Sequence, residues 1–195
     1  MTGDPLAALR AGTHVQHEAL EGSGWLEHAV ADRDAYGDHL LRVATFVRDA
    51  ECALAPFDDE LRAGGFAPAE RRKNGRVCEE LSALGLDAPA ADGGAAFPAL
   101  SDFSAAVGCL YVLEGSTLGG VLIARVVRER LDWESTFYGG YGRRTAEMWR
   151  AFASAANACA ATLNVTTLVP AAQATFEAYG ARITRVYASG VPLTA

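Results

Sequence analysis

Two stretches of this 195-residue chain carry side chains whose types and spacing suggest chemistry. In the first, Arg10, His17 and Glu21 recur at helical spacing and share one face of a helix. A metal-binding imidazole needs its second nitrogen held by an acceptor, and Glu21 is placed four residues after His17 for that role. Arg10 lies about 10 Å from His17 along the helix axis, within reach of an anionic group on a ligand. From spacing alone, a structural role for His17 stays open.

The second stretch, Phe103–Leu131, is the longest apolar run, yet Glu114 and Ser116 lie near its middle. It also holds three glycines within six residues, at Gly115, Gly119 and Gly120. Each glycine costs a helix about 1 kcal/mol relative to alanine, so their clustering needs a reason.

Three interpretations fit these glycines. A membrane helix uses the small-xxx-small spacing of Gly115 and Gly119, but Glu114 would then lie near the bilayer centre at high cost. A buried helix could cross another helix at close range through its glycines. A kinked helix could instead lie over a planar ligand, because glycine lets a bulky group approach the backbone.

The whole composition limits the class of protein. The net charge of −7 argues against a nucleic-acid partner, and the 50% hydrophobic content excludes a disordered chain. The four cysteines are widely spaced, as in a reduced protein, and the N-terminus lacks an apolar export signal. We therefore expect one cytoplasmic domain over residues 1–195, with no membrane partner. No helix shows a heptad seam, so we expect a monomer.

Helical periodicity dominates the chain and predicts an all-α bundle of six to eight helices. Residues 85–98 and 133–142 are expected to form loops. The basic run Arg71, Arg72, Lys73 and Arg76 is interpreted as the solvated face of one surface helix over 68–84. The remaining helices are expected near 5–21, 25–30, 35–54, 58–63, 103–131, 144–163 and 171–188.

The sequence LYVLEGSTLGG, at Leu110–Gly120, resembles the distal-helix signature of bacterial biliverdin-producing heme oxygenases. The similarity is strongest to the branch encoded beside bacteriophytochromes. The segment THVQHEALE, at Thr13–Glu21, resembles the proximal helix of the same family. FYGGYG, at Phe137–Gly142, and the Trp149–Phe152 spacing also fit, so the resemblance spans almost the whole chain.

This resemblance implies a helical bundle with heme b between a proximal helix and a kinked, glycine-rich distal helix. It implies that His17 is the axial iron ligand, that Glu21 supports it, and that Phe176 lines the pocket wall. The distal helix would contribute Gly115, Ser116, Gly119 and Gly120 as catalytic positions. The heme propionates would pair with Arg10, Tyr111 and Arg143.

The implied reaction uses heme as both cofactor and substrate. O2 and an external electron donor, ferredoxin or a similar protein, would cleave heme at a meso carbon to biliverdin, CO and ferrous iron. The biliverdin would supply a bacteriophytochrome. In a departure from many family members, Ser116 replaces an aspartate that orders a catalytic water, although the phytochrome-associated branch shares this serine. Val121 replaces a glutamine, with no physical account of its effect.

Two alternatives stay open. A heme carrier or sensor on the same fold would bind heme without turnover if the distal network had lost its chemistry. A related all-α protein that handles a pyrimidine or quinone cofactor would leave His17 with a structural role only.

Overall fold

The computed structural model describes residues 4–89 and 97–184, and all the regular secondary structure within them is helical. This confirms the predicted all-α class. Three 3-10 segments, Ala55–Phe57, Pro68–Arg71 and Gly142–Arg144, connect some of the helices. The helices are α1 (Pro5–Glu21), α2 (Trp25–Ala29), α3 (Arg33–Leu54), α4 (Asp58–Ala63), α5 (Asn74–Ala83), α6 (Phe103–Leu131), α7 (Thr145–Ala158) and α8 (Val165–Ile183). The predicted positions 90–96 and 185–188 lie outside the described residues.

The long helices begin where a side chain can accept hydrogen bonds from their first free N–H groups. Asp4 accepts from the backbone of α1, Asp32 from α3, Asp102 from α6 and Asn164 from α8. Each such cap contributes about 1 kcal/mol, because it satisfies a donor that has no partner within the helix. These local signals explain why α1 and α6 have the bounds predicted from the sequence.

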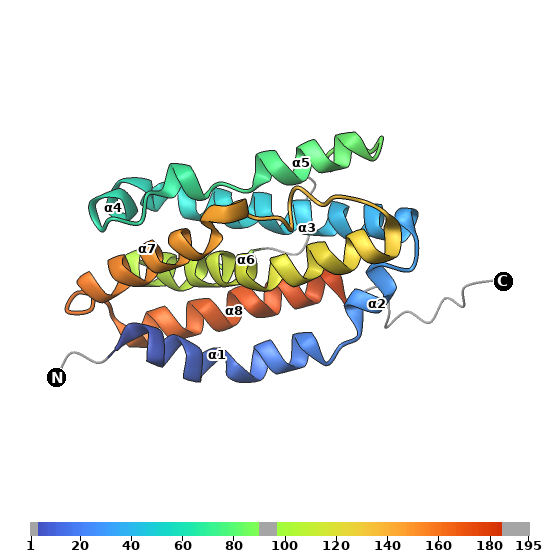
Figure 1. The fold of residues 1–195 in the computed structure, drawn as a ribbon. Helices are drawn as coiled ribbons and strands as arrows, with labels where there is room; N and C mark the ends of the chain where they lie inside the picture. The colour runs from blue at the N-terminus through green and yellow to red at the C-terminus, as the bar shows by residue number, and fades with distance from the viewer. Residues whose placement is uncertain (1–3, 90–96, 185–195) are drawn as a thin grey trace.

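Helices α1 and α8 lie side by side and run in the same direction (Figure 1). Gln173 Nε2 donates to the Gly12 carbonyl oxygen at 2.6 Å, and Gln16 Nε2 lies 3.4 Å from Glu177 Oε1 one turn further along both helices. The added Cβ of an alanine at Gly12 would overlap Val169. The close approach at Gly12 therefore sets how α1 rests on the C-terminal helix.

Helix α6 also runs parallel to α8, and the two helices make the most extensive contact in the bundle. Their N-termini are joined by Ser104 Oγ, which accepts from the Asn164 backbone N–H at 2.9 Å. A Cβ at Gly108 would overlap the Leu168 carbonyl oxygen. A close helix crossing through glycine thus exists, but at Gly108 instead of within the cluster 115–120.

Helix α6 continues without interruption through Gly115, Gly119 and Gly120. Its length and composition would also suit a membrane span, but 56% of its most apolar window is buried inside the structure. A core helix of a soluble protein passes the same test. The kink expected at the glycines stays a prediction.

The expected surface helix over 68–84 is wrong. The chain is extended at Arg72, and α5 begins only at Asn74. Glu51 of α3 caps α5, since its Oε1 accepts from the backbone N–H groups of Lys73 and Asn74 at 2.5 and 3.0 Å. This break turns Arg71 and Lys73 inward, where they are 4% and 5% exposed instead of solvated.

Two helix ends also differ from expectation. Helix α8 starts at Val165 and includes Pro170 in its second turn, whereas a start after Pro170 was predicted. The Asn164 cap and the packing of α8 against α1 and α6 outweigh the hydrogen bond lost at the proline. Helix α7 ends at Ala158, five residues before the predicted Leu163.

Candidate ligand-binding site

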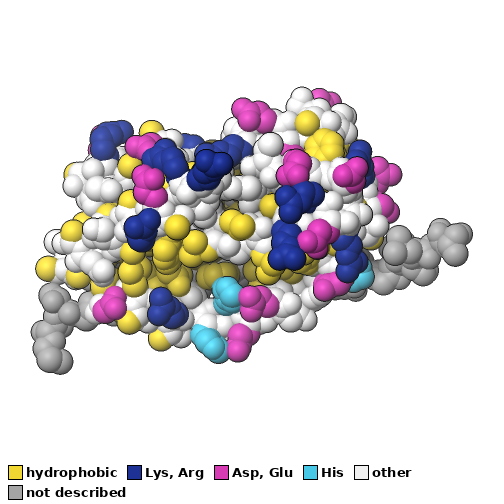
Figure 2. Space-filling model, viewed as in Figure 1, with side chains coloured by type: hydrophobic (Ala, Val, Ile, Leu, Met, Phe, Trp, Pro, Cys, Tyr) yellow, Lys and Arg dark blue, Asp and Glu magenta, His cyan; other side chains and the backbone are white. Residues whose placement is uncertain are grey.

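A cavity of about 440 Å³ opens between α1 and α6 and reaches α3, α7 and α8. Its volume falls in the range of roughly 300–1,000 Å³ typical of small-molecule sites. Figure 2 shows apolar side chains gathered in a hollow at the middle of this face, with histidines below it and Lys and Arg side chains above. Nine of the ten predicted site residues line the cavity: Arg10, His17, Glu21, Tyr111, Gly115, Ser116, Gly119, Gly120 and Phe176.

Arg143 is the predicted site residue that the structure does not bring to the cavity. It lies in the 3-10 segment Gly142–Arg144 and is exposed. The basic residues on that side of the cavity are Lys73, which directly precedes α5, and Arg76, which lies in its first turn. The cations at this side of the cavity therefore come from the basic run that was interpreted as a solvated surface, and not from Arg143 as predicted.

His17 presents its imidazole to the cavity. Its Nδ1 lies 3.4 Å from Glu21 Oε2, and its ring meets Phe176 edge-on at a centroid distance of 6.0 Å. Within residues 4–89 and 97–184, Nε2 has no hydrogen-bond partner. Because the Glu21 carboxylate lies beside Nδ1, Nε2 is the nitrogen available to a ligand. The side chain is 58% exposed.

His14 provides an internal comparison for His17. Its Nδ1 lies 3.2 Å from Glu18 Oε2, also four residues later, and its side chain is 64% exposed. His14 does not line the cavity. The pairing with a glutamate is therefore common to both histidines, and only the position beside the cavity distinguishes His17.

The three glycines of the α6 cluster have different surroundings. A Cβ at Gly119 would meet nothing within 4 Å, and one at Gly115 would just touch Trp149 at 4.0 Å. A Cβ at Gly120 would come within 2.9 Å of the Tyr138 carbonyl oxygen. Gly115 and Gly119 thus leave the helix backbone open to the cavity, whereas Gly120 admits the loop that follows α6.

Ser116 also faces the cavity from α6 and is exposed. Its Oγ donates to the Leu113 carbonyl oxygen at 2.8 Å, so the hydroxyl proton is used within the helix. The oxygen keeps its acceptor lone pairs. Ser116 can therefore accept a hydrogen bond from a water or ligand but brings no charge to the cavity.

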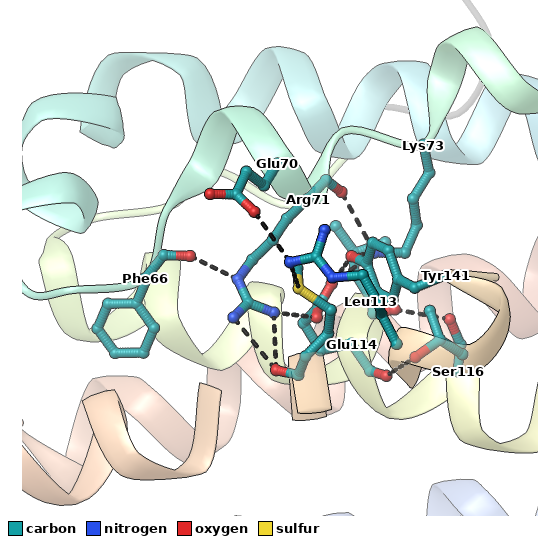
Figure 3. Close-up of polar contacts among 11 residues, drawn as sticks. Phe66, Glu70, Arg71, Lys73, Leu113, Glu114, Ser116 and Tyr141 are labelled. Carbon is teal, nitrogen blue, oxygen red and sulfur yellow. Dashed lines mark hydrogen bonds and ion pairs between the residues drawn. The ribbon is translucent and has the colours of Figure 1, made fainter. Parts of the chain in front are cut away.

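Glu114 is fully buried behind this face of α6 and anchors an ionic network (Figure 3). It accepts hydrogen bonds from Arg71, from Lys73 Nζ at 2.6 Å and from Tyr141 OH at 2.7 Å. Burial lowers the pKa of Lys73, although the Glu114 carboxylate opposes that shift. Burial and the same carboxylate raise the pKa of Tyr141. A buried carboxylate with this many donors fixes α6 against the 66–73 segment and the 137–142 loop.

A second buried carboxylate, Glu80 of α5, holds the start of the loop after α6. It accepts from Tyr36 OH at 2.8 Å, Trp133 Nε1 at 3.0 Å, Ser135 Oγ at 3.1 Å and the Phe137 N–H at 2.7 Å. None of its hydrogen-bond donors in the described part of the chain is a cation. Thr136 Oγ1 also donates at 3.4 Å, and these five neutral donors on one carboxylate fix the loop that presents Phe137, Tyr138 and Gly140 to the cavity.

His39 lies behind the cavity wall and is fully buried. Its Nε2 is 2.5 Å from Tyr138 OH, and its ring stacks on Trp25 at 4.9 Å. Burial and the charge of Arg42 lower the pKa of His39 to about 3, so its imidazole is neutral at physiological pH. His39 thus supports two cavity-wall side chains, Trp25 and Tyr138, without facing the cavity itself.

Sequence reasoning missed these supporting residues. Glu114 carried a usable signal, because a charge inside an apolar run requires a buried partner. The spacing could not show which of the four basic residues in 71–76 would meet it. For Glu80 and His39 the sequence held no comparable signal, since their partners lie 44 to 99 residues away.

Comparisons with known proteins address the fold. No protein-family model matches the chain, and no curated protein matches it by sequence. Among solved structures, the chain is similar to the NO- and CO-bound heme oxygenase from Neisseria meningitidis, with a TM-score of 0.78 and 19% sequence identity. The alignment covers 96% of this chain and 92% of that one. At this identity the likeness is one of architecture, and it establishes that the chain has the heme oxygenase fold.

Proposed function

We propose that this protein is a heme oxygenase that binds heme b in the α1–α6 cavity and cleaves it to biliverdin, CO and ferrous iron. The observation that carries the proposal is the meeting of His17 on α1 with the glycine-rich segment of α6 across one cavity. The heme oxygenase fold of the chain supports it. O2 and electrons from an external donor, ferredoxin or a similar protein, complete the reaction.

The residues of the cavity fit a heme. The His17 Nε2 is free within the described residues and suits an iron atom, and Glu21, 3.4 Å from Nδ1, is placed to orient the ring. The walls are mainly apolar, as a porphyrin needs, and include Tyr111, Trp149 and Phe176. Arg10 is a cation on the same face of α1 and suits a propionate. Heme supplies the redox chemistry and O2 binding when it is in place.

The chain's own residues would orient the reactants. Gly115 and Gly119 leave no side chain between the α6 backbone and the ligand, so steric guidance comes from the helix itself. Ser116 can hold a water through its oxygen but cannot supply a proton from a charged group. The apolar walls limit the access of other water. The network around Glu114 keeps the α6 backbone in position.

The first test is an anaerobic titration with hemin followed by absorbance. Oxygen and a reductant are then added to the same sample. Saturation at one hemin per chain, followed by loss of the Soret band and growth of biliverdin absorbance, is the expected result. A stable complex that cycles between ferric and oxygenated forms would point to the carrier or sensor. No saturable change in the Soret band would refute heme binding.

His17→Ala tests the proposed ligand, and His14→Ala is the matched control. Both remove a histidine from α1 that pairs with a glutamate four residues later. Only His17→Ala should change the spectrum of the ferric complex. Addition of free imidazole to this variant should then restore the wild-type spectrum. Equal spectra for the wild type and His17→Ala would exclude His17 as the ligand.

Two narrower parts of the proposal follow from the sequence: the widely spaced cysteines favour the cytoplasm, and the family resemblance suggests the partner. We place the protein in the cytoplasm and assign its biliverdin to a bacteriophytochrome. Transfer of the pigment from reacted protein to an apo-phytochrome, seen as growth of the phytochrome spectrum, is the test of that partner.

A further inference from the structure

Arg76 is a half-buried cation on the cavity wall that has no carboxylate partner among the described residues. One guanidinium nitrogen donates to the Gly140 carbonyl oxygen, and the group lies over the ring of Tyr141 at 4.9 Å. Its neighbours are paired: Arg71 binds Glu114, and Arg72 lies 2.6 Å from Asp58. Arg76 is therefore the exception within its own basic run.

Lys73, the other cation on this side of the cavity, is already satisfied. Its Nζ donates to Glu114 at 2.6 Å, to Tyr141 at 3.0 Å and to the Arg71 carbonyl oxygen at 3.3 Å. These three bonds use all the protons of an ammonium group. Arg76 makes one such bond and keeps most of its N–H donors unused. The available cation at this side of the cavity is thus Arg76.

A partly buried guanidinium without an anion has lost water contacts that no carboxylate replaces. A carboxylate on a cavity ligand would replace them, and a planar guanidinium can bind both of its oxygens. We infer that Arg76 binds a carboxylate of the ligand and thereby sets how the ligand is seated. This inference rests on the proposed function, in which the ligand is heme with its two propionates.

The position of Arg76 makes it a specificity-determining residue. It lies in the first turn of α5, whereas Arg10 lies on α1, and Figure 1 shows these helices on opposite sides of α6. A ring held by a carboxylate at Arg76 is turned differently in its plane from a ring held only at Arg10. The rotation decides which edge of the ring faces Gly115 and Gly119, and so which meso carbon is cleaved.

The test compares hemin with hemin dimethyl ester, which lacks both carboxylates. Arg76→Gln removes the charge, Arg76→Lys keeps it, and Arg62→Gln on α4 removes an equal charge from an exposed ion pair as the matched control. Absorbance titrations give each dissociation constant, and the proton NMR pattern of the heme methyl groups reports the seating. Thermal unfolding checks that each variant is folded.

We expect Arg76→Gln to weaken hemin binding roughly 10- to 100-fold, as loss of a charge-assisted hydrogen bond predicts, and to change the methyl pattern. Its affinity for the ester should stay at the wild-type value. Arg76→Lys should recover part of the hemin affinity, and Arg62→Gln should match the wild type throughout. Should Arg76→Gln itself fail to fold, Arg76→Lys tests the planar geometry of the guanidinium: its hemin affinity should still fall below the wild-type value, and its ester affinity should not.

Two outcomes overturn the inference while leaving the proposed function intact. In the first, the wild type and a folded Arg76→Gln variant bind hemin with the same affinity and give the same methyl pattern. In the second, the wild type binds hemin and its ester with equal affinity, and it also binds sulfate, which Arg76→Gln does not. That result would assign Arg76 to a free anion instead of a carboxylate of the ligand. A wild type that binds neither hemin nor ester overturns both the function and the inference.

Discussion

Glu114→Gln should be among the most destabilising single substitutions in the protein, although it changes hardly any volume. It leaves Arg71 and Lys73, which are 4% and 5% exposed, without their shared counter-charge. Breaking a buried ion pair by removing one partner costs about 3–5 kcal/mol. For a chain of this length, about 1 kcal/mol shifts the unfolding midpoint by 2–4 °C, so the midpoint should fall by roughly 6–20 °C.

The loss should also depend on pH in a defined direction. Burial already lowers the pKa of Lys73, and removing Glu114 deletes the main interaction that opposes this shift. The folded variant can then release the Lys73 proton more easily than the unfolded chain can. Its stability should therefore recover relative to wild type as pH rises toward the pKa of a free lysine.

Urea unfolding at several pH values, followed by circular dichroism, measures both effects. Glu129→Gln is the control, because it makes the same change on the same helix in an exposed pair with Arg125 and should leave stability unchanged. Lys73→Met should lower the free energy of unfolding by less in the Glu114→Gln background than in the wild type. A midpoint for Glu114→Gln within 2 °C of wild type, about 1 kcal/mol or less, would refute the assignment of a buried ionic network.

Three further predictions test other parts of the structure. His39 has a pKa of about 3 in the folded chain against 6.5 ordinarily, so between these values only the unfolded state gains its proton and stability falls as pH falls. His39→Gln should remove up to about 1.4 kcal/mol per pH unit of that slope in urea unfolding at pH 4–6, and an unchanged slope would contradict the assignment. Gly108→Ala should destabilise the fold by about 1–3 kcal/mol, because its Cβ meets the Leu168 backbone, and wild-type thermal stability would show that α6 and α8 can move apart. Gly119→Ala should raise stability by about 1 kcal/mol, because alanine favours the helix and its Cβ enters open space, yet it should weaken hemin binding at the cavity; unaltered hemin affinity would place the ligand elsewhere.

The parts of the fold that could be predicted depend on local signals. Asp4 with Pro5, and Asp102 before the long apolar run, carry their own capping information, and α1 and α6 accordingly have their predicted bounds. The predicted start of α5 was wrong because its capping residue, Glu51, comes from another helix. No spacing within 68–84 contains that contact.

The candidate site divides in the same way. His17 and Glu21, or Gly115 and Gly119, share a face of one helix, so periodicity places each set together without knowledge of the fold. Arg76 reaches the cavity only because the chain breaks before α5. The side of the cavity that Arg76 lines therefore depends on tertiary packing. The sequence does not show which basic residue of the run will lie there.

The shared direction of α1 and α8 bears on how the protein is made. Gln16 meets Glu177, which follows it by 161 positions in the chain. At synthesis rates of about 5–20 residues per second, roughly 8 to 30 seconds separate these residues as they leave the ribosome. During that interval α1 cannot pack as it does in the finished protein, and its apolar face has no permanent cover. The wall that carries His17 can take its final place only after the last helix has been synthesised, so the cavity should be completed last.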